Sequence, residues 1–209
     1  MSAVPVHLVE HPLAQDILLS LRDRHTPSDV FRQMARRISF LLTSEATRNL
    51  PVRDATVDTP VSSAPGRKLD VEVVVVPVLR AGLGMLDAVL ELLPRAKVGH
   101  IGLQRDESTA IASRYYAKVP GGLADACVLV VDPMLATGGS AVAALDLLRE
   151  SGARDIRLIC IVSAPEGVAE VERHHPDVQI YTPVVDQGLN AQKFIVPGLG
   201  DFGDRLFGT

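Results

Sequence analysis

The run from Asp132 to Ser140 combines a carboxylate, hydroxyls and glycines in a pattern that could bind a phosphate group. It follows the apolar residues 128–131, which predict a strand, and precedes a helix predicted near Ser140. Glycines let the backbone approach a ligand, and a helix N-terminus adds unpaired N–H donors. The hydroxyls of Thr137 and Ser140 add more donors. We therefore expect a cup for a phosphate monoester, with Asp132 placed to accept hydrogen bonds from sugar hydroxyls.

Other phosphate-binding motifs do not match this run. A Walker A loop needs Gly-Lys-Ser/Thr and a dinucleotide fingerprint needs Gly-x-Gly-x-x-Gly after the strand, and neither occurs here. The alternative interpretation is a plain strand-to-helix turn capped by Ser140, with Asp132 in solvent.

A second segment places a cation at a predicted strand end. Arg80 comes shortly after the apolar run 73–76, and Gly82 and Gly84 follow it before a predicted helix. The planar guanidinium makes two charge-assisted hydrogen bonds at once, which suits a dianionic or diphosphate group. Taken alone, this pattern more often marks an exposed arginine at a turn.

Charged residues also follow the predicted strand near 98–103, in the run Gln-Arg-Asp-Glu at 104–107. The polar segment after them holds Tyr115, Tyr116 and Lys118. It predicts a projecting arm that could close over a bound ligand. An ordinary hairpin with a solvated charge cluster is the alternative.

The C-terminal segment 194–209 is rich in glycine but also holds phenylalanine and β-branched residues. Pro197 and the repeated glycines argue against a helix or a regular strand through most of it. The apolar residues argue against a disordered tail. We expect an ordered loop whose backbone groups and an aromatic side chain suit a small flat ring, with an untied terminus as the alternative.

Alternating strands and helices must position these segments. Strands are predicted near 71–76, 98–103, 127–131 and 156–162, with helices from Pro12, near 27–29, over 86–93, and from Ser140 and Pro165. Residues 51–70 predict a strand followed by a loop. This order predicts an α/β fold with a parallel sheet covered by helices on both faces. Ligands in such sheets bind at the carboxyl ends of the strands. No domain boundary is visible in the sequence, so a single domain is predicted over residues 1–209.

Composition narrows the function further. The net charge of −4 and the pI of about 5.8 leave no broad basic field for a nucleic-acid backbone. The two cysteines, Cys127 and Cys160, lie in apolar runs and are expected to be reduced core thiols. Metal-ligand spacing, a signal peptide and a membrane-spanning run are absent from the sequence, so we expect a cytoplasmic protein.

The motifs together resemble the uracil phosphoribosyltransferase family along nearly the whole chain. They are Pro-Val-Leu-Arg-Ala-Gly-Leu-Gly-Met (77–85), Arg-Asp-Glu (105–107), Val-Asp-Pro-Met-Leu-Ala-Thr-Gly-Gly-Ser (131–140), Ala-Pro-Glu-Gly (164–167) and Pro-Gly-Leu-Gly-Asp-x-Gly-Asp-Arg (197–205). Several motifs in the family's order are far more specific than any one of them. Pro133 stands where other phosphoribosyltransferases usually carry a second acid.

The resemblance implies a type I phosphoribosyltransferase core with a mostly parallel sheet, a hood from the terminal segments and a β-arm. It implies transfer of the 5-phosphoribosyl group of 5-phosphoribosyl diphosphate (PRPP) to N1 of uracil. Arg80 and Arg105 would bind the diphosphate, and Asp132, Arg105 and Asp201 would be the catalytic residues. The ribose and 5-phosphate would be held by Asp132, Pro133, Met134, Leu135, Ala136, Thr137, Gly138, Gly139 and Ser140. Uracil would be recognised, largely through backbone groups, by Ile195, Gly200, Asp201 and Phe202, of which Asp201 would also face PRPP.

The resemblance further implies that Mg²⁺ enters with PRPP, that the chain forms a homo-oligomer, and that GTP is an effector in some bacterial members. Bacterial members commonly have Ala where this chain has Phe202 and Tyr where it has Phe194, so a phenyl ring beside the base could narrow the pocket. The alternatives are a phosphoribosyltransferase for another base, which Pro133 argues against, and a pyrimidine-sensing RNA-binding regulator on the same fold. The acidic composition gives the regulator little support.

Overall fold

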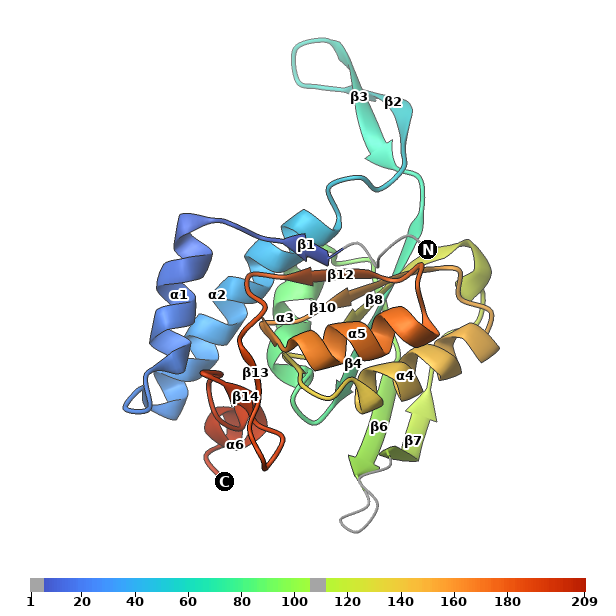
Figure 1. Cartoon of the computed structure of the whole chain (residues 1–209). Helices are drawn as coiled ribbons and strands as arrows, with labels where there is room; N and C mark the ends of the chain where they lie inside the picture. The colour runs from blue at the N-terminus through green and yellow to red at the C-terminus, as the bar shows by residue number, and fades with distance from the viewer. Residues whose placement is uncertain (1–5, 106–111) are drawn as a thin grey trace.

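The computed structural model of the chain describes residues 6–105 and 112–209, except the side chains of residues 104–105 and 112–114. Its central sheet has the strand order β1 (Val6–Leu8), β12 (Gln179–Thr182), β10 (Asp155–Ile159), β8 (Ala126–Val131), β4 (Glu72–Leu79), β6 (His100–Arg105) and β7 (Ala112–Lys118), with β5 (Lys97–Val98) beside β4. All neighbouring pairs run parallel except β6 and β7. The predicted mostly parallel sheet is confirmed (Figure 1).

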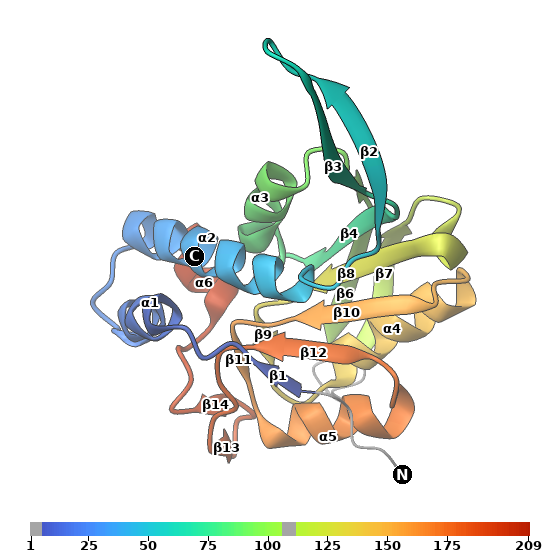
Figure 2. The same ribbon diagram turned by 90° about the horizontal axis from the view of Figure 1, so that it is seen from above.

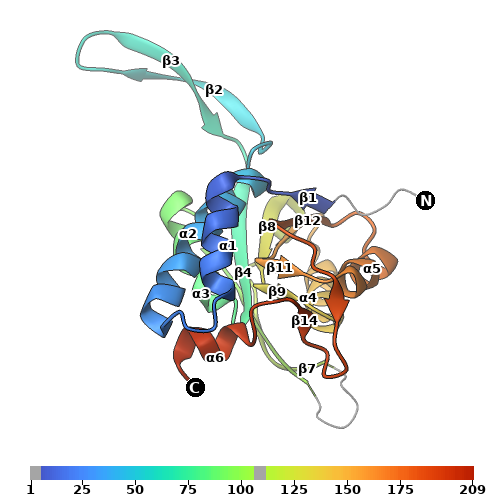
Figure 3. The ribbon, with the colours of Figure 1, turned by 60° about the vertical axis from the view of Figure 1, so that its left-hand side comes forward.

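Helices cover both faces of this sheet. They are α1 (Pro12–Arg22), α2 (Ser28–Ala46), α3 (Leu83–Leu92), α4 (Gly139–Glu150), α5 (Pro165–His174) and α6 (Phe202–Phe207), with a 3₁₀ turn at Leu123–Asp125. Figure 3 shows α1, α2 and α3 on one side of the sheet and α4 and α5 on the other. Each predicted helix is present. None of the described helices is long and apolar enough to cross a membrane.

The continuous apolar run of β4 explains why both faces are covered. Val73 and Val75 belong to the buried cluster beneath α1, α2 and α3, whereas Val74 and Val76 belong to the cluster beneath α4 and α5. Successive side chains of a strand point to opposite faces, so a strand buried on both faces is apolar throughout.

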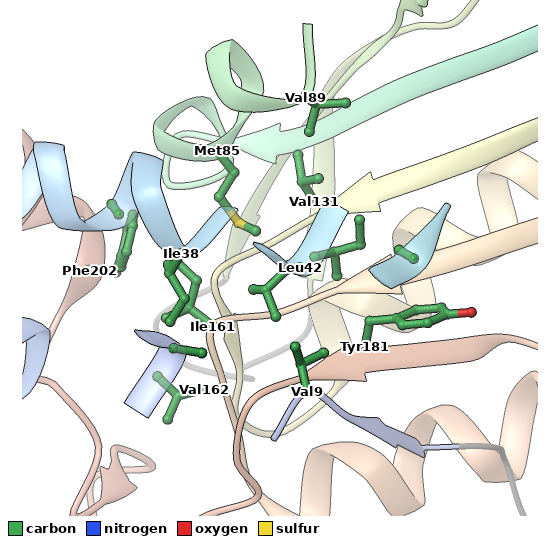
Figure 4. Close-up of a cluster of buried hydrophobic side chains, with 14 of the residues drawn as sticks. Val9, Ile38, Leu42, Met85, Val89, Val131, Ile161, Val162, Tyr181 and Phe202 are labelled. Atoms are coloured by element: carbon green, nitrogen blue, oxygen red, sulfur yellow. The ribbon is translucent and has the colours of Figure 1, made fainter. Parts of the chain in front are cut away.

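Side chains of the helices fill these clusters. Figure 4 shows Leu42 of α2 and Met85 of α3 near Val131 of β8, all in the first cluster. Cys127 belongs to the same cluster and Cys160 to the cluster on the opposite face. Both cysteines are free and fully buried, which confirms the prediction of core thiols.

Residues 51–70 form a hairpin, which corrects the prediction of a strand followed by a loop. β2 (Val52–Asp58) pairs antiparallel with β3 (Ser63–Leu69). Nearly every residue of both strands is exposed, so β3 lacks the apolar alternation that marks a half-buried strand. Pro65 and Gly66 add turn signals inside β3, although an edge strand tolerates proline. Figures 1 and 2 show this β2–β3 hairpin projecting away from the sheet and the helices.

The segment after residue 103 begins as an antiparallel hairpin, a geometry that both the predicted arm and its alternative allow. β6 and β7 pair antiparallel, and Arg105 lies opposite Ala112 at the described end of the pair. A side chain at Gly102 would collide with the ring of Tyr115, whose Cζ lies 2.5 Å from the position of a Cβ atom. Residues 106–111 lie outside the described residues, so closure of this arm over a ligand stays a prediction.

The C-terminal segment is ordered, as predicted, but residues 202–207 form a helix that the glycines had argued against. β14 (Ile195–Val196) pairs with β13 (Gly188–Leu189), and α6 follows. The carboxylate of Asp201 caps α6 by accepting the N–H of Asp204 at 2.9 Å. Gly208, with φ of 75°, ends the helix in the left-handed conformation. The two caps stabilise a helix that Gly203 alone would disfavour.

The C-terminal helix α6 packs in one layer with the N-terminal helices α1 and α2. Arg205 of α6 donates hydrogen bonds to the carbonyl oxygens of Leu21 and Asp23, where α1 ends. Its guanidinium also lies 4.4 Å from the ring centre of Phe31 on α2. A cation is favoured where helix carbonyls are unpaired. This layer of α1, α2 and α6 is the hood that the resemblance implied.

Candidate functional site

The loop after β8 is held by the neighbouring part of the chain. β9 (Met134–Leu135) pairs parallel with β11 (Val162–Ser163). The carbonyl oxygen of Pro133 accepts the N–H groups of residues 161 and 162 at 3.0 Å, and that of Leu135 accepts the N–H of Ala164 at 2.8 Å. The loop therefore has a fixed backbone path between Asp132 and the start of α4.

Glycines at two places let α5 pack against this loop. A Cβ atom at Gly167, in the first turn of α5, would lie 2.6 Å from the carbonyl oxygen of Ala136. Gly138 has φ of 84°, and a Cβ there would lie 2.7 Å from the Cβ of Glu170. Gly138 is the N-cap of α4 and no side chain caps this helix. The alternative interpretation, in which Ser140 serves only as a cap, is therefore not the geometry found.

Arg80 and Asp132 line one cavity at the carboxyl ends of β4 and β8. The cavity has a volume of about 170 Å³. It is lined by Val78, Leu79, Arg80, Ala81, Leu103, Asp132, Met134, Leu135, Ala136, Gly138, Ser140 and Ala141. The two segments that the sequence singled out most clearly therefore meet. Within the predicted loop, Pro133, Thr137 and Gly139 are not among the lining residues.

The backbone beneath Arg80 is tightly packed. A Cβ atom at Gly82 would lie 2.4 Å from the carbonyl oxygen of Val131 and 2.7 Å from the backbone nitrogen and oxygen of Val78. The Leu79–Arg80 peptide bond is cis. Gly82 thus allows the turn that carries Arg80 to lie directly against the end of β8, next to Asp132.

Arg105 is the last residue of β6, the strand beside β4. Leu103, two positions earlier, lines the cavity, and Gly102 lies opposite Leu79. The side chain of Arg105 is not among the described ones, and Asp106 lies outside the described residues. The strand that carries Arg105 therefore borders the cavity, and the contact of its guanidinium with a ligand stays a prediction.

The predicted base-recognition residues do not line this cavity. Ile195 is buried, Gly200 adopts φ of 80°, and the exposed Asp201 caps α6. The ring of Phe202 is only 1% exposed and packs edge-on against Phe31, with ring centres 5.1 Å apart. Figure 4 shows Phe202 beside α2, within the core. The ring of Phe202 is thus not available to a ligand.

The C-terminal segment approaches the cavity through α6. Nη2 of Arg80 lies 3.8 Å from Oδ1 of Asp204. A Cβ atom at Gly84, in the first turn of α3, would collide with side chains of Leu206 and Phe202. Contacts at the start of α3 therefore bring the hood next to the arginine of the cavity.

Sequence reasoning missed the side chains that hold the hood. Arg22 of α1 pairs with Asp186, and Arg205 donates to the carbonyl oxygen of Leu199 at 2.8 Å. Burial lowers the pKa of the Arg205 guanidinium. Charged residues far apart in the sequence give no spacing signal that could have paired them.

Comparisons with known proteins agree with this geometry. A model of the family described as uracil phosphoribosyltransferase matches residues 8–209. The chain belongs to the uracil phosphoribosyltransferase family. A uracil phosphoribosyltransferase of Dictyoglomus thermophilum is 51% identical over 98% of this chain and 99% of its own length. One from Bacillus pumilus is 49% identical over 98% of both chains.

Solved structures place the fold in the same group. A protein of Aquifex aeolicus superposes with a TM-score of 0.92 at 34% identity, over 97% of both chains. An adenine phosphoribosyltransferase of Leishmania donovani superposes with a TM-score of 0.57 at 14% identity, over 90% of this chain and 86% of its own. The second likeness concerns the fold alone, and it confirms the phosphoribosyltransferase core that the sequence implied.

Proposed function

We propose that this member of the uracil phosphoribosyltransferase family transfers the 5-phosphoribosyl group of PRPP to N1 of uracil, giving UMP and diphosphate, a reaction of pyrimidine salvage. The observation that carries the proposal is the shared cavity of Arg80 and Asp132, which adjoins the glycine-lined start of α4. A guanidinium, a carboxylate and a helix N-terminus at one place suit the diphosphate, the ribose hydroxyls and the 5-phosphate of one ligand. The cavity and the loop are formed by the central sheet and the helices that cover it. This supports a single domain over residues 1–209.

Each part of PRPP has a proposed partner. The loop residues that hold the 5-phosphate and ribose are Asp132, Pro133, Met134, Leu135, Ala136, Thr137, Gly138, Gly139 and Ser140. Arg80 and Arg105 bind the diphosphate, because a guanidinium forms two parallel hydrogen bonds with phosphate oxygens. The exposed side chain of Arg80, at 63%, is accessible for this role.

The reaction proceeds by loosening of the bond between the anomeric carbon and the diphosphate oxygen, which leaves an oxocarbenium-like sugar. Arg80 and Arg105 stabilise the charge that develops on the departing diphosphate. Asp132 holds the ribose hydroxyls and places negative charge near the cationic sugar. Uracil N1 then bonds to the anomeric carbon from the opposite face, so configuration inverts. The proton of N1 passes to Asp201 or to the diphosphate, and no covalent enzyme intermediate forms.

Magnesium is the proposed cofactor, and the residues present fit it. Mg²⁺ prefers oxygen ligands and is usually held by one or two carboxylates together with substrate phosphates. Asp132 supplies a carboxylate in the cavity, and PRPP supplies the phosphates. Among the described residues, no group of three or more His, Cys, Asp or Glu side chains is arranged to hold a metal ion. Bound Mg²⁺ would neutralise diphosphate charge.

Uracil is proposed to bind at the C-terminal segment, through Ile195, Gly200, Asp201 and the backbone of Phe202. The positive φ of Gly200 and the cap at Asp201 give this backbone a defined path. A base read by backbone groups depends on that path more than on any one side chain.

Two further properties concern assembly and regulation. The β2–β3 hairpin exposes apolar side chains, with Val52 at 45%, Val57 at 49% and Val61 at 93%, which supports association of copies into a homo-oligomer. Light scattering of the purified chain tests this. GTP is proposed as an effector on the family resemblance alone, and UMP formation with and without GTP tests it.

The proposed function is tested by an assay of UMP formation from PRPP against a panel of bases. We expect product with uracil and release of one diphosphate for each UMP. Product with a purine base instead would reassign the substrate. Absence of diphosphate release with every base would contradict the proposal, and a salt-sensitive shift of RNA in a gel would then favour a regulator.

A further inference from the structure

A nearly buried ion pair joins α1 to the segment before β13. Nη1 and Nη2 of Arg22 lie 2.9 and 2.7 Å from Oδ2 and Oδ1 of Asp186. The side chain of Asp186 is 3% exposed and that of Arg22 is 20% exposed. Two parallel charge-assisted bonds fix the orientation of both groups more narrowly than a single contact would.

The same pair holds both polar groups of Gly198. Oδ2 of Asp186 accepts the N–H of Gly198 at 2.9 Å, and Nη1 of Arg22 donates to its carbonyl oxygen at 2.7 Å. Gly198 adopts φ of 56°, and a Cβ atom there would lie 2.2 Å from the carbonyl oxygen of Ile195. This tight turn leads directly into residues 199–201. The ion pair therefore fixes a turn inside the proposed uracil-binding segment, between Ile195 and Gly200.

Asp186 is also tied to the phosphate loop. Its N–H donates to the carbonyl oxygen of Ser163 at 2.8 Å. Ser163 pairs with Leu135 through β11 and β9, and Leu135 lines the cavity beside Asp132. A short series of backbone hydrogen bonds thus runs from the loop proposed to hold the sugar phosphate to the carboxylate that holds Gly198.

We propose that Arg22 and Asp186 are positioning residues that set the uracil-binding segment 195–202 at a fixed place relative to the phosphate loop. Neither residue touches substrate in this assignment. The inference rests on the proposed function, since it concerns which substrate the segment binds. A site must be held within about half an ångström of its productive geometry by surrounding packing and hydrogen bonds, and this segment has little regular structure of its own.

The test uses Arg22→Lys and compares the two substrates. Lysine keeps the charge but loses the fork that bonds Asp186 and Gly198 together. We expect KM for uracil to rise on the order of tenfold, because a displacement near 1 Å suffices for effects of that size or larger. The dissociation constant of PRPP, measured by calorimetry without uracil, should change far less, because the phosphate loop keeps its own hydrogen bonds and Arg80 and Arg105 lie outside the displaced segment.

Arg157→Lys is the matched control. Arg157 is also a nearly buried arginine, with a side chain 5% exposed, and it pairs with Asp155 on the same strand. It donates to the carbonyl oxygen of Ala46 at 2.6 Å and to Asn49, so it joins β10 to the end of α2 and not to the C-terminal segment. We expect a lowered melting temperature in both variants and a rise in KM for uracil only in Arg22→Lys.

Asp186→Asn tests the pair from its other side and keeps the size of the side chain. It should also raise KM for uracil while changing the dissociation constant of PRPP far less. The addition of PRPP should still raise its melting temperature. An equal loss of affinity for uracil and PRPP, or an unchanged KM for uracil in the folded variants, would overturn the assignment. Failure of the proposed function is distinguishable, because the unaltered protein would then form no UMP.

Discussion

Nη2 of Arg80 lies 3.8 Å from Oδ1 of Asp204, so an exposed ion pair connects the cavity with the first turn of α6. The two side chains are 63% and 52% exposed, and such pairs contribute about 0–1 kcal/mol to stability. The pair matters more for ligand binding. Asp204 neutralises part of the charge with which Arg80 would attract a diphosphate.

Asp204→Asn should therefore tighten the binding of diphosphate and PRPP by a few-fold, on the order of the energy of an exposed pair. Calorimetric titration at low and high salt measures this, and the gain should shrink at high salt because exposed charges are screened. Asp87→Asn, an equal change of charge at an exposed acid of α3, is the control. Weaker binding by Asp204→Asn would show that Asp204 supports the ligand and does not compete with it.

Gly82→Ala should destabilise the fold and disturb the turn that carries Arg80. The added Cβ would lie 2.4 Å from the carbonyl oxygen of Val131, and backbone cannot move aside as a flexible side chain can. Overpacking of this kind costs about 1–3 kcal/mol. Urea unfolding measures the loss. Gly66→Ala on β3, where nothing lies within 4 Å, is the control and should change stability little. Equal stability of both variants would contradict the packing described.

The apolar strand β4 shows what could be predicted from the sequence. A continuous apolar run indicated the strand, and the glycine-containing segments after it and after β8 indicated where a phosphate ligand would bind. Motifs that lie within one loop are visible as local patterns. Asp132 and Arg80 could be assigned to one site because strand ends of a parallel sheet share an edge.

Other features depend on contacts that no local pattern reveals. Arg22 and Asp186 are 164 positions apart, and only the fold brings them together. The β2–β3 hairpin was missed because an exposed two-stranded hairpin has no buried face to impose alternation on β3. α6 was missed because the repeated glycines of segment 194–209 outweighed the capping signal of Asp201. The buried ring of Phe202 packs on Phe31 from α2, a contact between distant segments.

Phe202→Ala should act on stability and not on the choice of base. Its ring is 1% exposed and packs against Phe31, and truncating a buried phenylalanine costs about 3–5 kcal/mol. We expect a large fall in melting temperature and an unchanged ratio of kcat/KM between uracil and 5-substituted uracils. Phe207→Ala, at a ring of the same helix that is 44% exposed, is the control. A changed ratio in Phe202→Ala would place the ring beside the base.

The buried thiols predict how stability depends on pH. Burial raises the pKa of the Cys127 thiol to about 12, against about 8.5 for an ordinary thiol. Burial, and then the charge of Asp132, also raise the pKa of the Cys160 thiol well above its usual range. The unfolded chain releases these protons first as pH rises. The stability that the protonated thiols give the folded state is therefore complete below about pH 8.5. It is lost as pH rises toward the pKa of the thiols in the folded state.

Above about pH 9, each thiol should lower the free energy of unfolding by about 1.4 kcal/mol per pH unit. Urea unfolding between about pH 8 and 11 measures this slope. Cys127→Ala should remove the contribution of one thiol and leave a shallower slope. Identical slopes in the two proteins would contradict the raised pKa.

The central claim is that Asp132 lies at the reacting ribose of PRPP, in the cavity it shares with Arg80. Steady-state UMP formation by Asp132→Asn tests it most directly, with Asp125→Asn, at an exposed acid just before β8, as the control. The account predicts that Asp132→Asn lowers kcat by about 10²–10³-fold in a folded protein, while Asp125→Asn keeps the normal rate. A normal kcat in Asp132→Asn would contradict it.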